Sequence, residues 1–159
     1  MSFQYVMYRP KKDGTSGLAA NLTIKEDKCF LSVARQQPSQ GENDSFSWSK
    51  PGEISDPKKN VNIKLGLPDI GAILAVLDGW QPEAKLFHKF QPKEGAEVTT
   101  QITVANYMKE NNHAGYSFNI LRQGEKFGWL TGFGEAEVIK TILKEAVLNQ
   151  CYFEVEKKA

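Results

Sequence analysis

A block of short alternating segments, followed by a stretch with helical spacing, occurs twice in this chain and limits the folds that it can adopt. Within each block, apolar and polar residues alternate with a period of two, which is typical of antiparallel strands with one buried face. Each block is followed by a stretch whose apolar residues recur at helical spacing. The order predicts the plan ββββα–ββββα, with repeats at about residues 1–79 and 80–150.

The expected strands are separated by turns rich in glycine and polar residues. In the first repeat the strands are 3–9, 18–25, 28–36 and a broken fourth strand that begins at 46–50, is interrupted at 51–59 and resumes at 61–65. In the second repeat the strands are 85–90, 97–107, 116–122 and 126–133.

Two helices are expected, one after each set of strands. The first covers residues 68–78, because Pro68 suits the first helical position and Gly79 suits the position after the last turn. The second covers about 134–149, and its apolar stripe consists of Val138, Ile139, Ile142, Leu143, Ala146 and Val147. A ββββα half cannot cover its own sheet, so the halves are expected to pack into one α+β domain of residues 1–150, followed by a short C-terminal tail at 151–159.

Composition narrows the classes of function. The 20 Lys and Arg residues against 19 Asp and Glu residues give a net charge of +1, whereas a general duplex binder shows a clear basic excess. The two cysteines and two histidines lack zinc-site spacing, so no metal is expected, and two isolated thiols fit a reducing compartment. The N-terminus has no signal-like segment, and the longest apolar stretch, Ile70–Leu77, is too short to span a bilayer. We therefore expect a cytoplasmic protein, or a viral protein in the host cytoplasm, neither secreted nor in a membrane.

No arrangement of residues points to catalysis. His88 alternates with aromatic residues and is interpreted as a partly buried strand residue rather than a general base, while His113 lies in a polar turn. The glycines Gly128, Gly132 and Gly134 lack the strand–GxGxxG–helix context of a dinucleotide site and are interpreted as turn or bulge positions. The sequence predicts a protein that is not an enzyme, with no catalytic residue and no cofactor.

Aromatic residues interleaved with basic ones are the most informative feature for function. Bases stack on aromatic faces while lysines and arginines follow the phosphates, so this pattern favours binding of single-stranded nucleic acid. The expected stacking residues are Phe46, Trp48, Phe87 and Trp129, with Tyr8 beside the first basic group. The expected phosphate contacts are Arg9, Lys11, Lys12, Lys50, Lys89, Arg122 and Lys126. The alternative is that these rings fill the core, since strands favour aromatic residues in any case.

Several segments, in this order and spacing, resemble the Whirly family of single-stranded DNA-binding proteins. The segments are Phe46-Ser47-Trp48-Ser49-Lys50, residues 63–74 at the start of the first helix, Ala84-Lys85-Leu86-Phe87-His88-Lys89, residues 115–120 and residues 134–139. The similarity covers about residues 1–149. The sequence also departs from the family pattern, because the interruption at 51–59 is longer and the family's Lys-Gly-Lys-Ala-Ala-Leu segment has no clear counterpart.

The resemblance implies two packed four-stranded antiparallel sheets, with two helices that join protomers into a homo-oligomer, a dimer or a tetramer. It also implies that single-stranded DNA lies along the sheet edges with little sequence preference, in replication, recombination or repair. Related folds include the transcriptional positive-cofactor family and the kinetoplastid guide-RNA-binding proteins, so an RNA-binding or RNA-annealing protein is one alternative. A pure assembly module, in which the aromatic residues are core, is the other.

Overall fold

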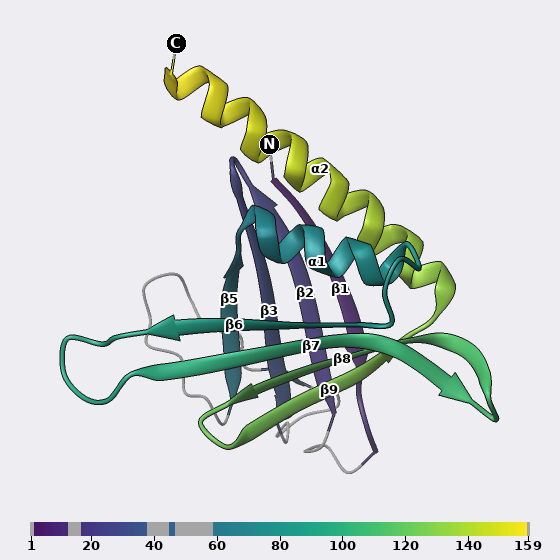
Figure 1. Cartoon of the computed structure of the whole chain (residues 1–159). Helices are drawn as coiled ribbons and strands as arrows, with labels where there is room; N and C mark the ends of the chain where they lie inside the picture. Colours follow the sequence, from purple (N-terminus) through teal and green to yellow (C-terminus); the bar gives the residue numbers. More distant parts are fainter. Residues whose placement is uncertain (1, 13–16, 38–44, 47–58, 159) are drawn as a thin grey trace. The chain divides into compact units, whose positions relative to one another are not determined.

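The computed structural model describes residues 2–12, 17–37, 45–46 and 59–158. The chain forms two compact units, one made of residues 1–65 and 149–159 and the other of residues 66–148. The order of elements confirms the predicted plan, because each long set of antiparallel strands is followed by one helix (Figure 1).

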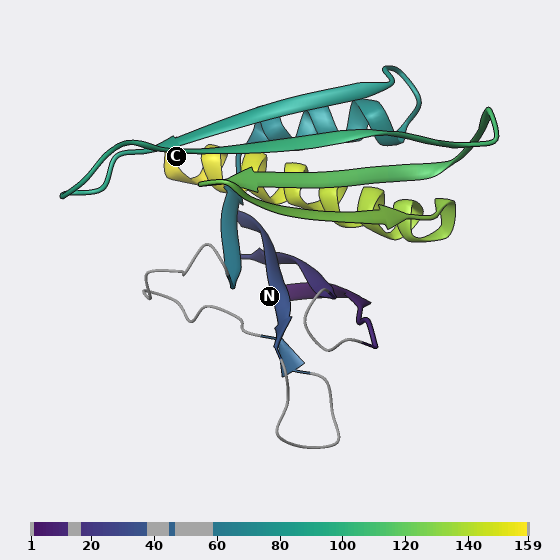
Figure 2. The ribbon, with the colours of Figure 1, turned by 90° about the horizontal axis from the view of Figure 1, so that it is seen from below.

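The first sheet belongs to the first unit. Its main strands run in the order β1 (Ser2–Arg9), β2 (Leu18–Lys25), β3 (Lys28–Gln37) and β5 (Asn60–Leu65), all antiparallel (Figure 2). The short strand β4 (Ser45–Phe46) pairs with the end of β3, where Phe46 faces Gln36. Both pieces of the predicted broken fourth strand therefore pair with β3, and residues 47–58 between them lie outside the described residues.

One face of the first sheet is apolar and buried. Leu22, Leu31 and Ile63 face one another across β2, β3 and β5, as the period-two alternation predicts. Cys29 lies on the same face as a free thiol, and its burial raises the pKa of the thiol to about 12. The cysteine therefore acts as a small apolar core residue, as the sequence predicts.

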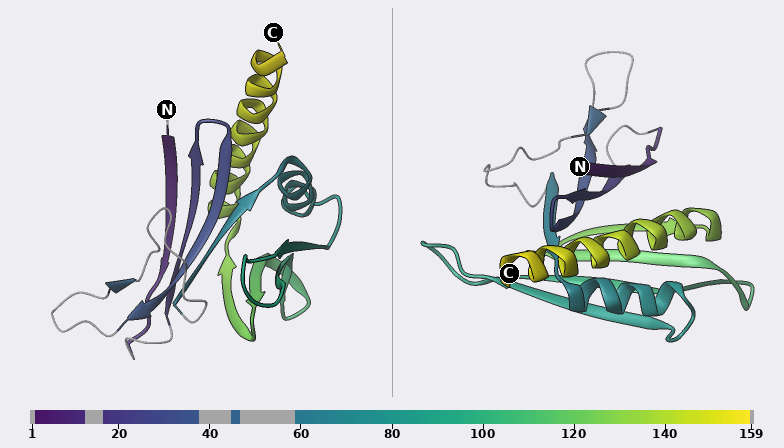
Figure 3. Two further views of the ribbon diagram at one scale, coloured as in Figure 1. Left: turned by 90° about the vertical axis from the view of Figure 1, so that its left-hand side faces the viewer. Right: turned by 90° about the horizontal axis from the view of Figure 1, so that it is seen from above.

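The second unit contains helix α1 (Leu67–Leu77) and the second sheet. The strands of this sheet run in chain order as β6 (Glu83–Phe90), β7 (Val98–Lys109), β8 (Asn112–Arg122) and β9 (Glu125–Thr131), again antiparallel. Helix α1 lies against one face of this sheet, over β6 and β7 (Figure 3).

Both ends of α1 are tied to that face of the second sheet. At the N-terminal end, Asp69 accepts a hydrogen bond from the Gly66 amide at 2.8 Å and lies 3.1 Å from His88 Nε2 on β6. At the C-terminal end, the buried Tyr116 hydroxyl on β8 donates to the Leu77 carbonyl at 3.1 Å. The partly buried position that the sequence predicts for His88 is confirmed, and its neighbour is a carboxylate that caps the helix.

Helix α2 (Phe133–Lys158) differs from the prediction in length and in its buried stripe. It continues through residues 151–158, which we predict as a tail, because neither glycine nor proline follows Asn149 to end it. Among the side chains of α2 that the structure describes, the buried ones are Ala136, Ile139, Leu143 and Ala146. Val138, predicted within the stripe, is 41% exposed, because it lies one position away from this line of i, i+3 and i+4 neighbours.

Charged residues join the two helices within the second unit. Lys140 of α2 lies 2.6 Å from Glu137 and 3.3 Å from Asp78, the residue that follows α1. The hydrogen bond to Glu137, helped by Asp78, raises the pKa of Lys140, so this ammonium group stays charged.

Gly115 is the glycine whose replacement tests the second sheet most directly. Its φ of +138° is strained for other residues, and a Cβ there would lie 2.4 Å from the Thr131 carbonyl oxygen. We expect Gly115→Ala to lower the free energy of unfolding by about 1–3 kcal/mol, measured by urea denaturation. Gly71→Ala is the control: no atom lies within 4 Å of its Cβ position, and alanine in helix α1 is expected to stabilise by about 1 kcal/mol. Equal effects of the two changes would contradict this interpretation.

Candidate nucleic-acid interface

Most buried side chains of the second sheet lie on one face, whereas the side chains on the other face are half-buried or exposed. Its members include Lys85 on β6, Gln101 on β7, Asn119 on β8 and Lys126 on β9. We call this side the outer face. The opposite, inner face carries His88 and Tyr116, which bond to α1, so the outer face points away from that helix.

Two cross-strand rows define the centre of the outer face. The ladder pairs place Phe87, Gln101, Leu121 and Lys126 in one row across all four strands. The neighbouring row consists of Lys85, Thr103, Asn119 and Gly128. Phe87 is 60% exposed, so an aromatic ring, an aliphatic side chain and an amide are presented together on a pleated surface.

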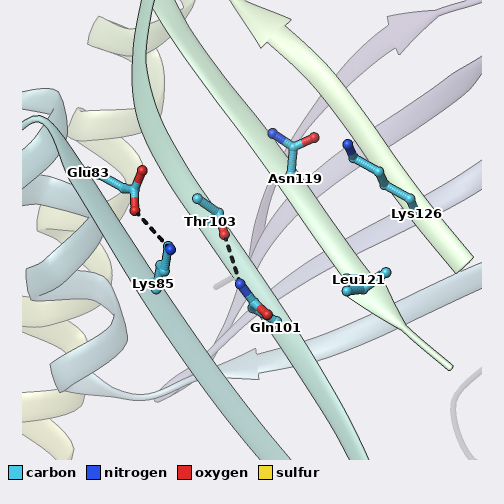
Figure 4. A pocket seen from close by; sticks show the side chains of 7 residues that line it. All are labelled: Glu83, Lys85, Gln101, Thr103, Asn119, Leu121 and Lys126. Atoms are coloured by element: carbon cyan, nitrogen blue, oxygen red, sulfur yellow. Dashed lines mark hydrogen bonds and ion pairs between the residues drawn. The ribbon is translucent and has the colours of Figure 1, made fainter. Parts of the chain in front are cut away.

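A depression of about 400 Å³ lies over these rows (Figure 4). It is lined by Glu83, Lys85, Gln101, Thr103, Asn119, Leu121 and Lys126. Lysines therefore stand on β6 and β9, on either side of polar side chains from β7 and β8. Cations around neutral hydrogen-bonding groups are suited to a ligand with an anionic backbone and polar rings.

Two lysines of the outer face make only weak ion pairs. Lys85 lies 3.4 Å from Glu83, and Lys89 lies 3.9 Å from Glu97, all with exposed side chains. Exposed pairs of this kind contribute roughly 0–1 kcal/mol. A phosphate group can therefore replace these carboxylates at little cost.

The structure brings together three of the predicted residues of the second repeat. Phe87 and Lys89 lie on the outer face, and Lys126 occupies the same row as Phe87. Arg122 does not join them, because it lies in the inner-face row with His88 and Thr100.

Trp129 also lies on the inner face. It is only 5% exposed and stacks on Phe118, with ring centroids 5.2 Å apart and planes 10° from parallel. The prediction that Trp129 stacks on bases is wrong for this structure, because its ring is a core residue. The alternative interpretation, that strand aromatics fill the core, holds at this position.

The predicted residues of the first repeat lie in the first unit or outside the described residues. Tyr8 is 57% exposed, and Arg9 donates from Nη1 to the Tyr8 carbonyl at 3.1 Å. Lys11 and Lys12 are exposed after β1, and the Lys11 amide donates to the buried Gln36 side chain at 2.9 Å. Phe46 lies in β4, whereas Trp48 and Lys50 lie outside the described residues.

Sequence reasoning missed the polar residues of the depression. The period-two pattern of the strands already gives non-buried positions to all four of them, Lys85, Gln101, Thr103 and Asn119. The sequence signal for these residues is therefore the strand assignment itself. What a single sequence lacks is the register that makes them neighbours.

Among the described residues, no cluster of His, Cys, Asp and Glu could hold a metal ion. No helix within the described ranges is both long and apolar enough to cross a bilayer.

Comparison with known proteins places the fold. Neither a protein-family model nor a curated protein sequence matches the chain. Solved structures do match it over nearly its whole length. The Arabidopsis thaliana protein WHY3 gives a TM-score of 0.62 at 16% identity, covering 99% of this chain and 95% of that one. The chain has a Whirly-like fold.

Two further structures agree with this fold. The plant transcriptional regulator PBF-2 gives a TM-score of 0.63 at 14% identity, covering 98% of this chain and 86% of that one. The Trypanosoma brucei MRP1/MRP2 structure gives a TM-score of 0.61 at 13% identity, covering 97% and 89%. The predicted fold class and the resemblance to the Whirly fold are therefore confirmed.

Replacing Trp129 separates a core role from a surface role. We expect Trp129→Ala to lower the free energy of unfolding by about 3–5 kcal/mol, because it removes a large buried ring that stacks on Phe118. The neighbouring change Leu130→Ala, at a 48% exposed position, is the control and is expected to cost about 0.5 kcal/mol or less. Chemical denaturation measures both, and similar values for the two variants would argue against the core assignment.

Proposed function

We propose that this chain is a non-catalytic protein that binds single-stranded DNA on the outer face of its second sheet. The observation that carries this proposal is the row in which exposed Phe87 stands beside Gln101, Leu121 and Lys126, with Lys85 and Lys89 on the same strand as Phe87. Stacking and charge would act together there, since unpaired bases expose flat faces and an anionic backbone.

The charge of the chain suits a single strand better than a duplex. With a net charge of +1, long-range attraction is weak, so binding must come from local contacts. A base stacked on an aromatic ring contributes about 1–3 kcal/mol, and every base offers such a face. The proposed binding therefore has little sequence preference. The fold that the chain shares with PBF-2, a plant transcriptional regulator, is in keeping with a nucleic-acid ligand.

The proposal also covers the cellular process, the location, further contact residues and the oligomeric state. We propose a cytoplasmic role in replication, recombination or repair, with Tyr8, Arg9, Lys11 and Lys12 of the first unit as a second set of contacts. We also propose a homo-oligomer, a dimer or a tetramer, joined through the helices. The exposed apolar residues Val138, Leu148 and Tyr152 of α2 support that association.

Titration with fluorescein-labelled dT oligomers, followed by anisotropy at low and rising salt, tests the proposal. The logarithm of the binding constant should fall linearly with the logarithm of salt concentration, with a slope of about −0.7 per phosphate contacted. No anisotropy change at low salt would exclude the proposed function and favour the assembly module. Competition between matched dU and rU oligomers separates DNA from RNA, because the two strands differ only in the ribose 2′-hydroxyl, by which a protein can distinguish them.

Phe87 and Phe90 form a matched pair for the stacking contact. Both lie on β6 and both are 60% exposed, but they fall on opposite sides of the strand alternation. We expect Phe87→Ala to weaken dT binding by about 1–3 kcal/mol with little change in stability, whereas Phe90→Ala leaves affinity unchanged. Anisotropy and urea denaturation report the two quantities. Equal losses of affinity in the two variants would show that the outer face is not the binding surface.

A further inference from the structure

Asn119 is a polar side chain of the outer face that makes no polar contact within the described residues. Its neighbour Gln101 donates from Nε2 to the Thr103 hydroxyl at 3.4 Å, and Lys85 pairs with Glu83. The Asn119 amide makes no hydrogen bond or other polar contact in the part of the chain that the structure describes. It points into the depression between the strands, next to Lys126 (Figure 4).

Gly128 leaves the space that the Asn119 amide occupies. The two residues face each other across β8 and β9, and a Cβ on Gly128 would lie 2.6 Å from Asn119 Oδ1. Any side chain at position 128 would therefore push the amide away. The absence of a side chain on β9 leaves room for the amide beside the lysine of the next row.

We infer that Asn119, which lies over Gly128, hydrogen-bonds the polar edge of an unpaired base that lies in the depression. The inference rests on the proposed function and adds to it a contact with the base edge, beyond stacking and charge. A carboxamide presents one acceptor and one donor side by side. Thymine presents the complementary pair, so Oδ1 would accept from N3–H and Nδ2 would donate to the O4 carbonyl.

The size and charge of the site suit one nucleotide. A volume of about 400 Å³ is near the lower end of small-ligand pockets, which take roughly 300–1,000 Å³. Lys85 and Lys126 line the same depression from β6 and β9, so a base edge at Asn119 would leave phosphates within reach of cations on both sides. Bases in single strands expose their Watson–Crick edges, which a duplex hides.

Oligomers of N3-methylthymidine test the inference. Methylation blocks N3–H but keeps the charge of the backbone and the stacking face of the ring. We expect the wild-type protein to bind the methylated oligomer about threefold to tenfold more weakly than dT, the loss of one neutral hydrogen bond. The variant Asn119→Leu should bind dT more weakly by a similar factor and should no longer distinguish the two oligomers.

Two further variants control for indirect effects. Gly128→Ala keeps the amide but displaces it, so it should also lose the discrimination against methylated thymine. Gln81→Leu removes an exposed amide outside the depression and should keep the full discrimination. Unfolding curves of all variants are compared to show that they fold.

The outcomes separate the inference from the function it rests on. Loss of discrimination in Asn119→Leu and Gly128→Ala, but not in Gln81→Leu, supports the base-edge contact. If the wild-type protein binds dT but tolerates N3-methylation, or if Asn119→Leu still discriminates, the inference is wrong while the proposed function stands. If the wild-type protein does not bind dT at all, the proposed function is wrong as well.

Discussion

The register of the second sheet is the constraint on which the candidate site depends. The pairing of Phe87 with Gln101, of Gln101 with Leu121 and of Leu121 with Lys126 builds a row from four segments spread over the second repeat. Because side chains alternate between faces, a slip of one residue in any of these strands would turn its contribution toward α1. Apolar burial of Leu86, Ile102, Ile120 and Phe127 on the other face opposes such a slip.

Contacts on the inner face also support the strands that form the outer face. Asp69 and Tyr116 fix the two ends of α1 to β6 and β8, and Lys140 links the residue after α1 to α2. The strands that carry the candidate site are thus braced from behind by buried or partly buried polar contacts. Side chains on such strands are held more precisely than those on loops, which suits a surface that must present rings and amides in a set order.

The sequence predicts the architecture well because its signals are periodic and local. The alternation of Leu18 to Lys25 and the spacing of Ile70, Ile73 and Leu77 predict β2 and α1 with bounds close to those observed. The site is predicted less well, because which face is buried is a tertiary property. Phe87 and Trp129 look alike in sequence, yet one is exposed and the other packs on Phe118. Arg122 shows the same limit, since its position in the alternation places it in the row of His88, on the face opposite Phe87.

The contrast between the two cysteines has a practical consequence. Cys29 is sealed within the first sheet with a pKa of about 12, so almost none of it is thiolate near neutrality, whereas Cys151 is exposed on α2. Of the two thiols in the unmodified chain, only that of Cys151 is therefore accessible to maleimide reagents. A spin label or dye can be attached to one known turn of one helix without any engineered mutation, and there it would test the proposed association between copies of that helix.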